Sequence, residues 1–185
     1  MKRIIKAAAG ISLGLAATAG VAAAQDMGST RAVSFGIAGG ATLPMGDIGD
    51  GYGTGYNIMG TLGYQPMAMP VGLRLDVGYH SLGVDEEFDI GDPDDLRVIS
   101  GTANAVLTVA NSGGVKPYVL GGIGMYNVDY GVGDSETKFG LNGGGGLEFP
   151  LAGFSTFAEA RFHHVFTDDE APSVQLVPIV FGIRF

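Results

Sequence analysis

Apolar and polar residues alternate along much of this chain. The clearest case is residues 71–80, where Val71, Leu73, Leu75, Val77 and Tyr79 alternate with Gly72, Arg74, Asp76, Gly78 and His80. Neighbouring side chains of a β-strand point to opposite faces, so this period places large apolar groups on one face and charged groups on the other. A shift of one residue would exchange the two faces. The segment therefore predicts an amphipathic strand whose two faces meet different surroundings.

Seven further segments share this period. They are residues 32–43, 56–64, 97–109, 116–130, 138–149, 155–165 and 174–185. The orientation of residues 116–130 stays open, because their glycines blur the alternation. After the first 24 residues no stretch has apolar residues at helical spacing, and glycine, with 33 residues in the chain, recurs too often for stable helices. The pattern predicts an all-β protein with eight antiparallel strands.

The connections between the predicted strands alternate in length. Three are short or marked by Pro and Gly, at residues 65–70, 111–114 and 150–153, and four are longer, at residues 44–54, 81–96, 131–137 and 167–173. Short turns at one rim and long loops at the other are typical of an up-and-down transmembrane β-barrel of the bacterial outer membrane. We therefore expect extracellular long loops and, with an even strand count, periplasmic termini.

A water-soluble β-sandwich is the alternative fold, since it would bury the apolar face of each strand and expose the polar one. Aromatic residues near the strand ends favour the membrane, because such residues form girdles at the bilayer interfaces. The predicted girdle residues are Tyr56, Tyr64, Tyr79, Tyr118, Tyr126, Phe149, Phe166 and Phe185.

The start of the chain also favours an envelope protein, because it has the pattern of a secretory signal peptide. A basic start at residues 1–6 precedes an Ala-rich apolar stretch at 7–21, and residues 22–24 offer an A-x-A cleavage site. We expect cleavage between Ala24 and Gln25, with one β-barrel domain over residues 25–185. The chain has no cysteine, which excludes a disulfide framework and lipoprotein acylation.

The charge is strongly acidic, with 19 acidic and 10 basic residues, and three of the basic ones lie in the signal segment. Such a surface would repel the phosphates of nucleic acid. Most of the carboxylates fall in the four long loops. Clustered carboxylates can bind calcium or bridge to lipopolysaccharide through divalent cations, although their spacing does not match an EF-hand. A solvated rim is the simpler interpretation, and we expect no resident metal or cofactor.

The polar strand faces predict a charged interior. If the apolar faces meet lipid, three cations and three anions face the lumen, in addition to His80 and His163. They are Arg74, Asp76, Glu148, Glu159, Arg161 and Arg184. The interior of an eight-stranded barrel is about filled by side chains, and buried charges must be paired. We therefore expect a salt-bridged lumen network rather than a wide channel, although a narrow solute pore stays open.

Catalysis is a further alternative for the same residues. A hydrolase needs a nucleophile, a base and an orienting group within hydrogen-bond reach. Ser155 is the only serine of its strand and lies eight residues from His163, and the chain has no His-x-Ser arrangement of the deacylase kind. His163 and His164 should face opposite sides, so they cannot share a metal. We expect no enzyme activity, and a lipid A-modifying enzyme is the less favoured reading.

Three segments resemble a known family. They are Lys116 to Gly124 (KPYVLGGIG), Phe157 to Phe162 (FAEARF) and Val177 to Phe185 (VPIVFGIRF), and they are similar to segments of the small OmpA/OmpX-like outer-membrane β-barrels. The resemblance covers essentially the whole mature chain and implies a monomeric barrel in contact with outer-membrane lipid and lipopolysaccharide. It also implies that Phe185 is the C-terminal signal read transiently by the barrel-assembly machinery. Its motifs specify fold and location, and say little about activity.

Overall fold

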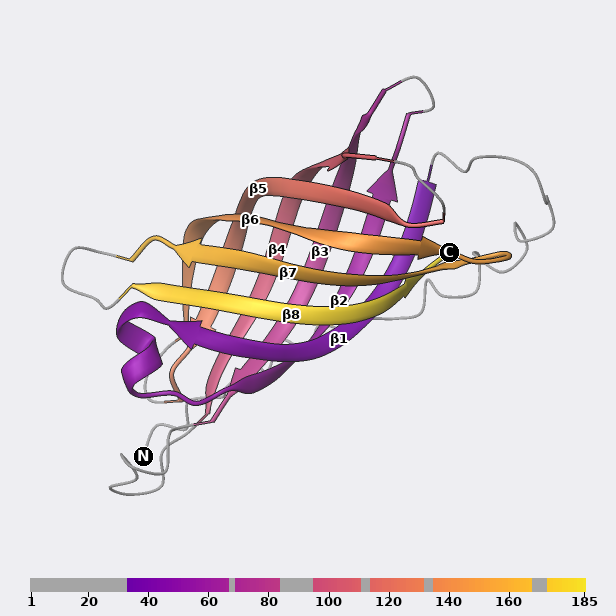
Figure 1. The fold of residues 1–185 in the computed structure, drawn as a ribbon. Coiled ribbons are helices and arrows are strands. Elements are labelled where there is room, and N and C mark those ends of the chain that lie inside the picture. Colours follow the sequence, from indigo (N-terminus) through magenta and orange to yellow (C-terminus); the bar gives the residue numbers. More distant parts are fainter. Residues whose placement is uncertain (1–32, 67–68, 84–94, 111–113, 132–134, 168–172) are drawn as a thin grey trace, which may run out of the picture.

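The protein is a single closed β-barrel. The computed structural model describes residues 33–66, 69–83, 95–110, 114–131, 135–167 and 173–185. Within these ranges eight antiparallel strands follow one another in chain order around the barrel, and the last pairs with the first (Figure 1). The all-β prediction and the strand number are confirmed, whereas the predicted signal segment, with Ala24 and Gln25, lies outside the described residues.

The strand bounds agree with the sequence periodicity to within two residues. The strands are β1 (Val33–Met45), β2 (Gly55–Tyr64), β3 (Val71–Leu82), β4 (Leu96–Thr108), β5 (Lys116–Asp129), β6 (Glu136–Pro150), β7 (Ser155–Val165) and β8 (Val174–Arg184). One departure is a short 3-10 helix, η2 (Gly46–Asp50), in the first long connection, where the periodicity predicted no helix. It lies at one end of the barrel, and the C-terminus lies at the other (Figure 1).

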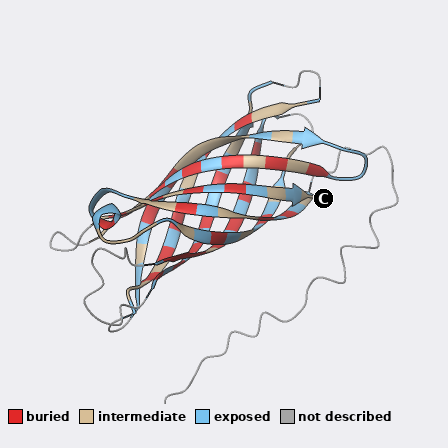
Figure 2. Ribbon diagram, turned by 60° about the horizontal axis from the view of Figure 1, so that its bottom comes forward, coloured by how far each residue is buried: buried red, intermediate tan, exposed pale blue. Residues whose placement is uncertain are grey.

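Burial alternates along most of the strands, most clearly along β3 and β7, as Figure 2 shows. The outward positions expose large apolar side chains that a water-soluble protein would bury. Phe181 is 68% exposed and Val77 65% exposed. The inward positions carry most of the buried polar and charged residues, including Arg74 and Glu159. This inverted distribution and the closed sheet rule out the β-sandwich alternative, because a sandwich buries its apolar faces. None of the described helices has the length and hydropathy that a membrane-spanning helix requires.

The orientation of β5, which the sequence left open, is settled by the structure. Tyr118 and Tyr126 face the lumen and are 4% and 0% exposed, whereas Val119 and Ile123 face outward. The prediction that both tyrosines belong to the outer aromatic girdles was therefore wrong. Gly121, Gly122 and Gly124 lie on both faces of β5 and removed the apolar pattern that would have fixed the register.

The closure of the barrel extends to its last residue. The backbone N–H of Phe185 donates to the carbonyl of Phe35 at 2.8 Å, and the N–H of Phe35 donates back at 3.1 Å. The two rings stack with their centroids 5.5 Å apart, and Phe154 lies 6.3 Å from Phe185. Phe185 thus belongs to an outward aromatic group at the end of the barrel that carries the short turns.

Candidate functional site

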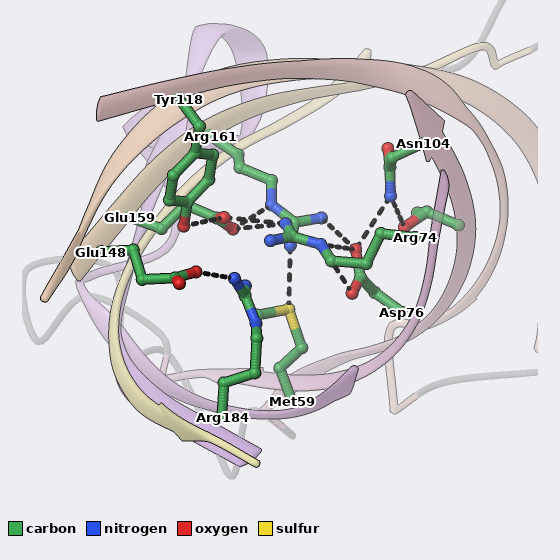
Figure 3. A network of polar contacts seen from close by, with 10 residues as sticks. Met59, Arg74, Asp76, Asn104, Tyr118, Glu148, Glu159, Arg161 and Arg184 are labelled. Atoms are coloured by element: carbon green, nitrogen blue, oxygen red, sulfur yellow. Dashed lines mark hydrogen bonds and ion pairs between the residues drawn. The ribbon is translucent and has the colours of Figure 1, made fainter. Parts of the chain in front are cut away.

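The centre of the lumen holds four charged side chains from two strands, which we call the ion cluster: Arg74 and Asp76 of β3 and Glu159 and Arg161 of β7 (Figure 3). All four are at most 4% exposed. Each strand contributes a cation and an anion at adjacent inward positions, so opposite charges meet both along a strand and across the lumen.

Glu159 accepts hydrogen bonds from three side chains of the lumen. Nη2 of Arg74 donates to both of its carboxylate oxygens, at 3.0 and 2.8 Å, and Arg161 donates through Nε. The hydroxyl of Tyr118 donates to the same carboxylate at 2.7 Å. Asp76 completes the cluster, 2.9 Å from Nη1 of Arg161 and 3.1 Å from Nε of Arg74. The two cations and two anions balance, which is the condition for burying charges in a low-dielectric interior.

The other two predicted network residues form a separate pair. Nη1 of Arg184 donates to Glu148, and the guanidinium lies 4.8 Å from the ring centroid of Phe157. It also lies 5.9 Å from the ring of Tyr118, as does the guanidinium of Arg74. The six residues therefore face the lumen as two groups, with Tyr118 between them, and not as one network (Figure 3).

Neutral polar residues beside the ion cluster were not identified from the sequence. The amide of Asn104 donates to Asp76 at 2.8 Å and to Thr102 at 2.9 Å. Tyr118 was assigned to the outer girdle because aromatic residues near strand ends usually mark the bilayer interface. The available signal for Asn104 was its position two residues from Thr102, which places both side chains on the same face of β4. The sequence held no such signal for Tyr118, because the glycines of β5 blur its alternation.

A second layer of the lumen contains two buried histidines. Nδ1 of His80 hydrogen-bonds to Thr42 at 3.0 Å, and Nδ1 of His163 hydrogen-bonds to Tyr126 at 2.8 Å. Their ring centroids are 6.1 Å apart. His164 lies outward between two phenylalanine rings, as the alternation predicted. No described group of three or more His, Asp or Glu side chains has the arrangement of a metal site.

Apolar side chains close the lumen at the end that carries the long loops, and we call them the apolar cap. They are Ile48, Leu82, Leu96, Val98, Tyr126, Val128, Val165, Val174 and Leu176, with Tyr52 and Tyr130 packed against them. Ile48 comes from η2 and is 3% exposed, so the 3-10 helix inserts a side chain into the barrel mouth. The lumen is thus filled by charged groups at its centre and by hydrocarbon at this mouth.

The helix that carries Ile48 is tethered to the start of the neighbouring strand, β8. Oδ2 of Asp47 accepts hydrogen bonds from the backbone N–H and from the hydroxyl of Ser173, each at 2.9 Å, which joins η2 to the segment before β8. These two bonds lower the pKa of the Asp47 carboxyl from its ordinary value, and the bond from the backbone N–H has the larger effect. The most acidic part of the long loops, residues 85–94, lies outside the described residues.

The tether predicts a pH dependence at this mouth. The folded pKa of Asp47 is lowered, so its contribution to stability is complete above the unfolded value of about 4 and is lost as the pH falls through the folded pKa. NMR of the Ser173 amide in detergent micelles should show the bonded signal at pH 7 and its loss in acid. Asp47→Ala should lose that signal at both pH values. Asp50→Ala, which changes an exposed acid of the same helix, is the control, and an unchanged Ser173 signal in Asp47→Ala would contradict the tether.

The residues considered for catalysis are not brought together. Ser155 and His163 both face the lumen, but they lie at opposite ends of β7, and eight residues of strand span about 26 Å. Glu159 lies between them on the same strand, with its carboxylate bonded to Arg74, Arg161 and Tyr118. The geometry of these residues is that of a packed interior, without the nucleophile–base contact of a hydrolase.

Comparisons with known proteins identify the barrel type. The model of the family described as outer membrane protein beta-barrel domain matches residues 11–185. Neisserial surface protein A is 18% identical with a TM-score of 0.62, and 83% of this chain and 96% of that one are covered. The Yersinia pestis attachment invasion locus protein Ail is 22% identical with a TM-score of 0.51, covering 83% and 97%. The outer membrane enzyme PagL is 18% identical with a TM-score of 0.51, covering 82% and 98%. No curated protein sequence matches the chain.

Proposed function

Because this chain belongs to the outer membrane protein β-barrel domain family, we propose that it serves the outer membrane as a closed barrel with a structural or surface-interaction role. The observation that carries the proposal is the filled lumen. The ion cluster occupies its centre, and the apolar cap occupies the mouth beside the long loops. A solute would have to displace paired, buried charges and packed hydrocarbon to pass, both of which are costly.

We also propose an orientation, which the same family setting supports. We place the short turns and Phe185 in the periplasm and the long acidic loops outside the cell, where loops on a rigid scaffold commonly carry recognition. The outward apolar band contacts lipid, and lipopolysaccharide is the lipid that the long-loop end would meet. A monomer is sufficient for this role. Cleavage by added protease in intact cells, confined to the long loops, would support this orientation, and cleavage confined to the short turns would contradict it.

Liposome swelling tests the closed state. Proteoliposomes that contain the folded protein should not swell faster in a small sugar than liposomes without protein. The alternative of a narrow solute pore predicts faster swelling that depends on the amount of protein. Heat-modifiable mobility of the same sample on a denaturing gel should be recorded first, since it shows that the barrel is folded.

An enzyme is the second candidate, because the fold is shared with the outer membrane enzyme PagL. The activity considered from the sequence is modification of lipid A. Fold similarity at this identity carries no activity by itself. The separation of Ser155 from His163 supports a non-enzymatic role. Mass spectrometry of lipid A from cells with and without the gene should give identical spectra, and a change in the acyl chains on expression would favour the enzyme.

We further propose that Phe185 acts in assembly as the C-terminal signal read by the barrel-assembly machinery. Its ring is 42% exposed at the periplasmic rim in the proposed orientation, and it also stacks on Phe35 across the closing seam. Phe185→Ala should lower the yield of folded protein in the outer membrane several-fold. Phe154→Ala, which removes a neighbouring ring and leaves the C-terminus intact, is the matched control. Equal yields of Phe185→Ala and wild type would contradict the proposal.

A further inference from the structure

A small cavity lies in the lumen between the ion cluster and the two histidines. Its walls include Asn57, Asp76, His80, Arg161, His163 and Pro178. The free space is about that of one water molecule. Most of the lining residues carry polar side chains, but apolar atoms make up most of the wall surface that faces the free space. A water in such a cavity needs two to four of those polar groups as partners.

One residue that lines the cavity has a buried polar atom without a hydrogen-bond partner among the described residues. Asn57 is 5% exposed, and its Nδ2 donates to the carbonyl of Ala41 and to the hydroxyl of Thr42, both at 2.9 Å. These two bonds fix the amide with its oxygen turned away from β1. Oδ1 of Asn57 then has no hydrogen-bond partner among the described residues. Oδ1 of Asp76, another lining residue, forms an ion pair with Nε of Arg74 at 3.1 Å. A buried acceptor left unsatisfied is costly, so Oδ1 of Asn57 is expected to accept a hydrogen bond from a donor in the cavity.

A break in the sheet lies at the same cavity. The pairing of β8 with β7 is interrupted between Ala160 and His163, opposite Pro178, whereas the pairing of β8 with β1 continues through Pro178, opposite Thr42. Proline has no N–H to donate, and a proline in a central strand removes one bond of the ladder. The described wall of the barrel thus has a backbone hydrogen-bond gap where Pro178 and Arg161 line the cavity.

A glycine keeps the cavity open. A Cβ at Gly78 would lie 2.7 Å from the hydroxyl oxygen of Ser100 and 3.1 Å from Nε2 of His80. The second of these distances shows that Nε2 of His80 lies beside the space above Gly78. A residue with a side chain at this position would take up the room that a water needs.

We propose that this cavity is a structural water site. One water in it donates a hydrogen bond to Oδ1 of Asn57 and hydrogen-bonds to the polar groups that lie beside Pro178. The charges on its walls favour a neutral ligand. Arg161 would repel a metal cation, the carboxylates of Asp76 and Glu159 would repel an anion, and the ion cluster is already balanced. A buried water with two to four polar partners is common in proteins.

A crystal structure that resolves ordered solvent tests the site directly. The wild-type protein should show one water within hydrogen-bond distance of Oδ1 of Asn57. NMR in detergent micelles gives a second measurement, because water–protein cross-peaks should appear at residues that line the cavity, such as Ser100. An empty cavity, or an Asn57 amide turned to bond another protein group, would overturn the proposal.

A matched pair of glycine variants separates the water from a general change in the strand. Gly78→Ala places a methyl group in the cavity and should abolish the solvent peak and the cross-peaks. Gly101→Ala adds the same methyl group to the outer face of β4, where a Cβ would meet nothing within 4 Å, and should leave both signals unchanged. Retention of the water in folded Gly78→Ala would also overturn the assignment. If Gly78→Ala does not fold, the wild-type measurements still decide.

Discussion

Glu159→Ala should lower the free energy of unfolding in detergent by roughly 3 to 5 kcal/mol, the range found when one partner of a buried ion pair is removed. The substitution leaves the guanidinium groups of Arg74 and Arg161 with only Asp76 to balance them, and it removes the acceptor of the Tyr118 hydroxyl. The chain has no tryptophan, so its unfolding in urea cannot be monitored by tryptophan fluorescence. Circular dichroism is the suitable measurement.

Arg161→Ala should destabilise the barrel comparably, because it leaves Glu159 and Asp76 with one cation between them. Glu136→Ala is the control. Glu136 pairs with Lys138 at 3.2 Å, but its side chain is 61% exposed, and an exposed ion pair contributes at most about 1 kcal/mol. Equal stabilities of Glu159→Ala, Arg161→Ala and wild type would show that the ion cluster does not stabilise the barrel.

Gly40→Ala should destabilise the closing seam by about 3 kcal/mol, the upper part of the usual range for overpacking. A Cβ at Gly40 would lie 1.9 Å from the carbonyl oxygen of Ile179 and 3.0 Å from Cα of Val180, so the backbones of β1 and β8 would have to separate. Rigid backbone cannot give way as a flexible side chain can. The measurement is the midpoint of heat-induced loss of the compact form on a gel.

Gly60→Ala is the counterpart of Gly40→Ala on the outer face of the neighbouring strand. A Cβ there would meet nothing within 4 Å, and the substitution should leave the midpoint unchanged or raise it slightly, because alanine loses less conformational freedom on folding. If both variants melt at the wild-type midpoint, the close approach of β1 and β8 at Gly40 has no energetic consequence.

The strands could be predicted from the sequence because each inward position differs in polarity from its neighbours. Arg74 and Asp76 alternate with large apolar residues, so only one register satisfies both lipid and lumen. In β5 glycines occupy both faces, and the pattern could not show that Tyr118 and Tyr126 point inward. The prediction of the lumen depended on the same alternation. It could place six charged residues on the inner face, but it could not tell which of them form pairs.

Which lumen residues pair depends on their positions around the barrel and along its axis. The two-residue alternation of a strand holds no information on either position. Arg184 and Glu148 therefore form a pair apart from the ion cluster. The apolar cap was missed for a different reason. Inward positions change from polar to apolar toward the long loops, as from His80 to Leu82 and from His163 to Val165. That gradient is present in the sequence, but an apolar residue at an inward position weakens the alternation that marks the two faces.

Single-channel recording in a planar bilayer tests the closed lumen most directly. Folded protein should insert, as judged by heat-modifiable mobility of the reconstituted sample, and give no reproducible open steps at moderate voltage. The ion cluster and the apolar cap would both have to rearrange for ions to pass. Reproducible open steps of uniform size from the wild-type barrel would contradict the closed lumen and favour the narrow pore.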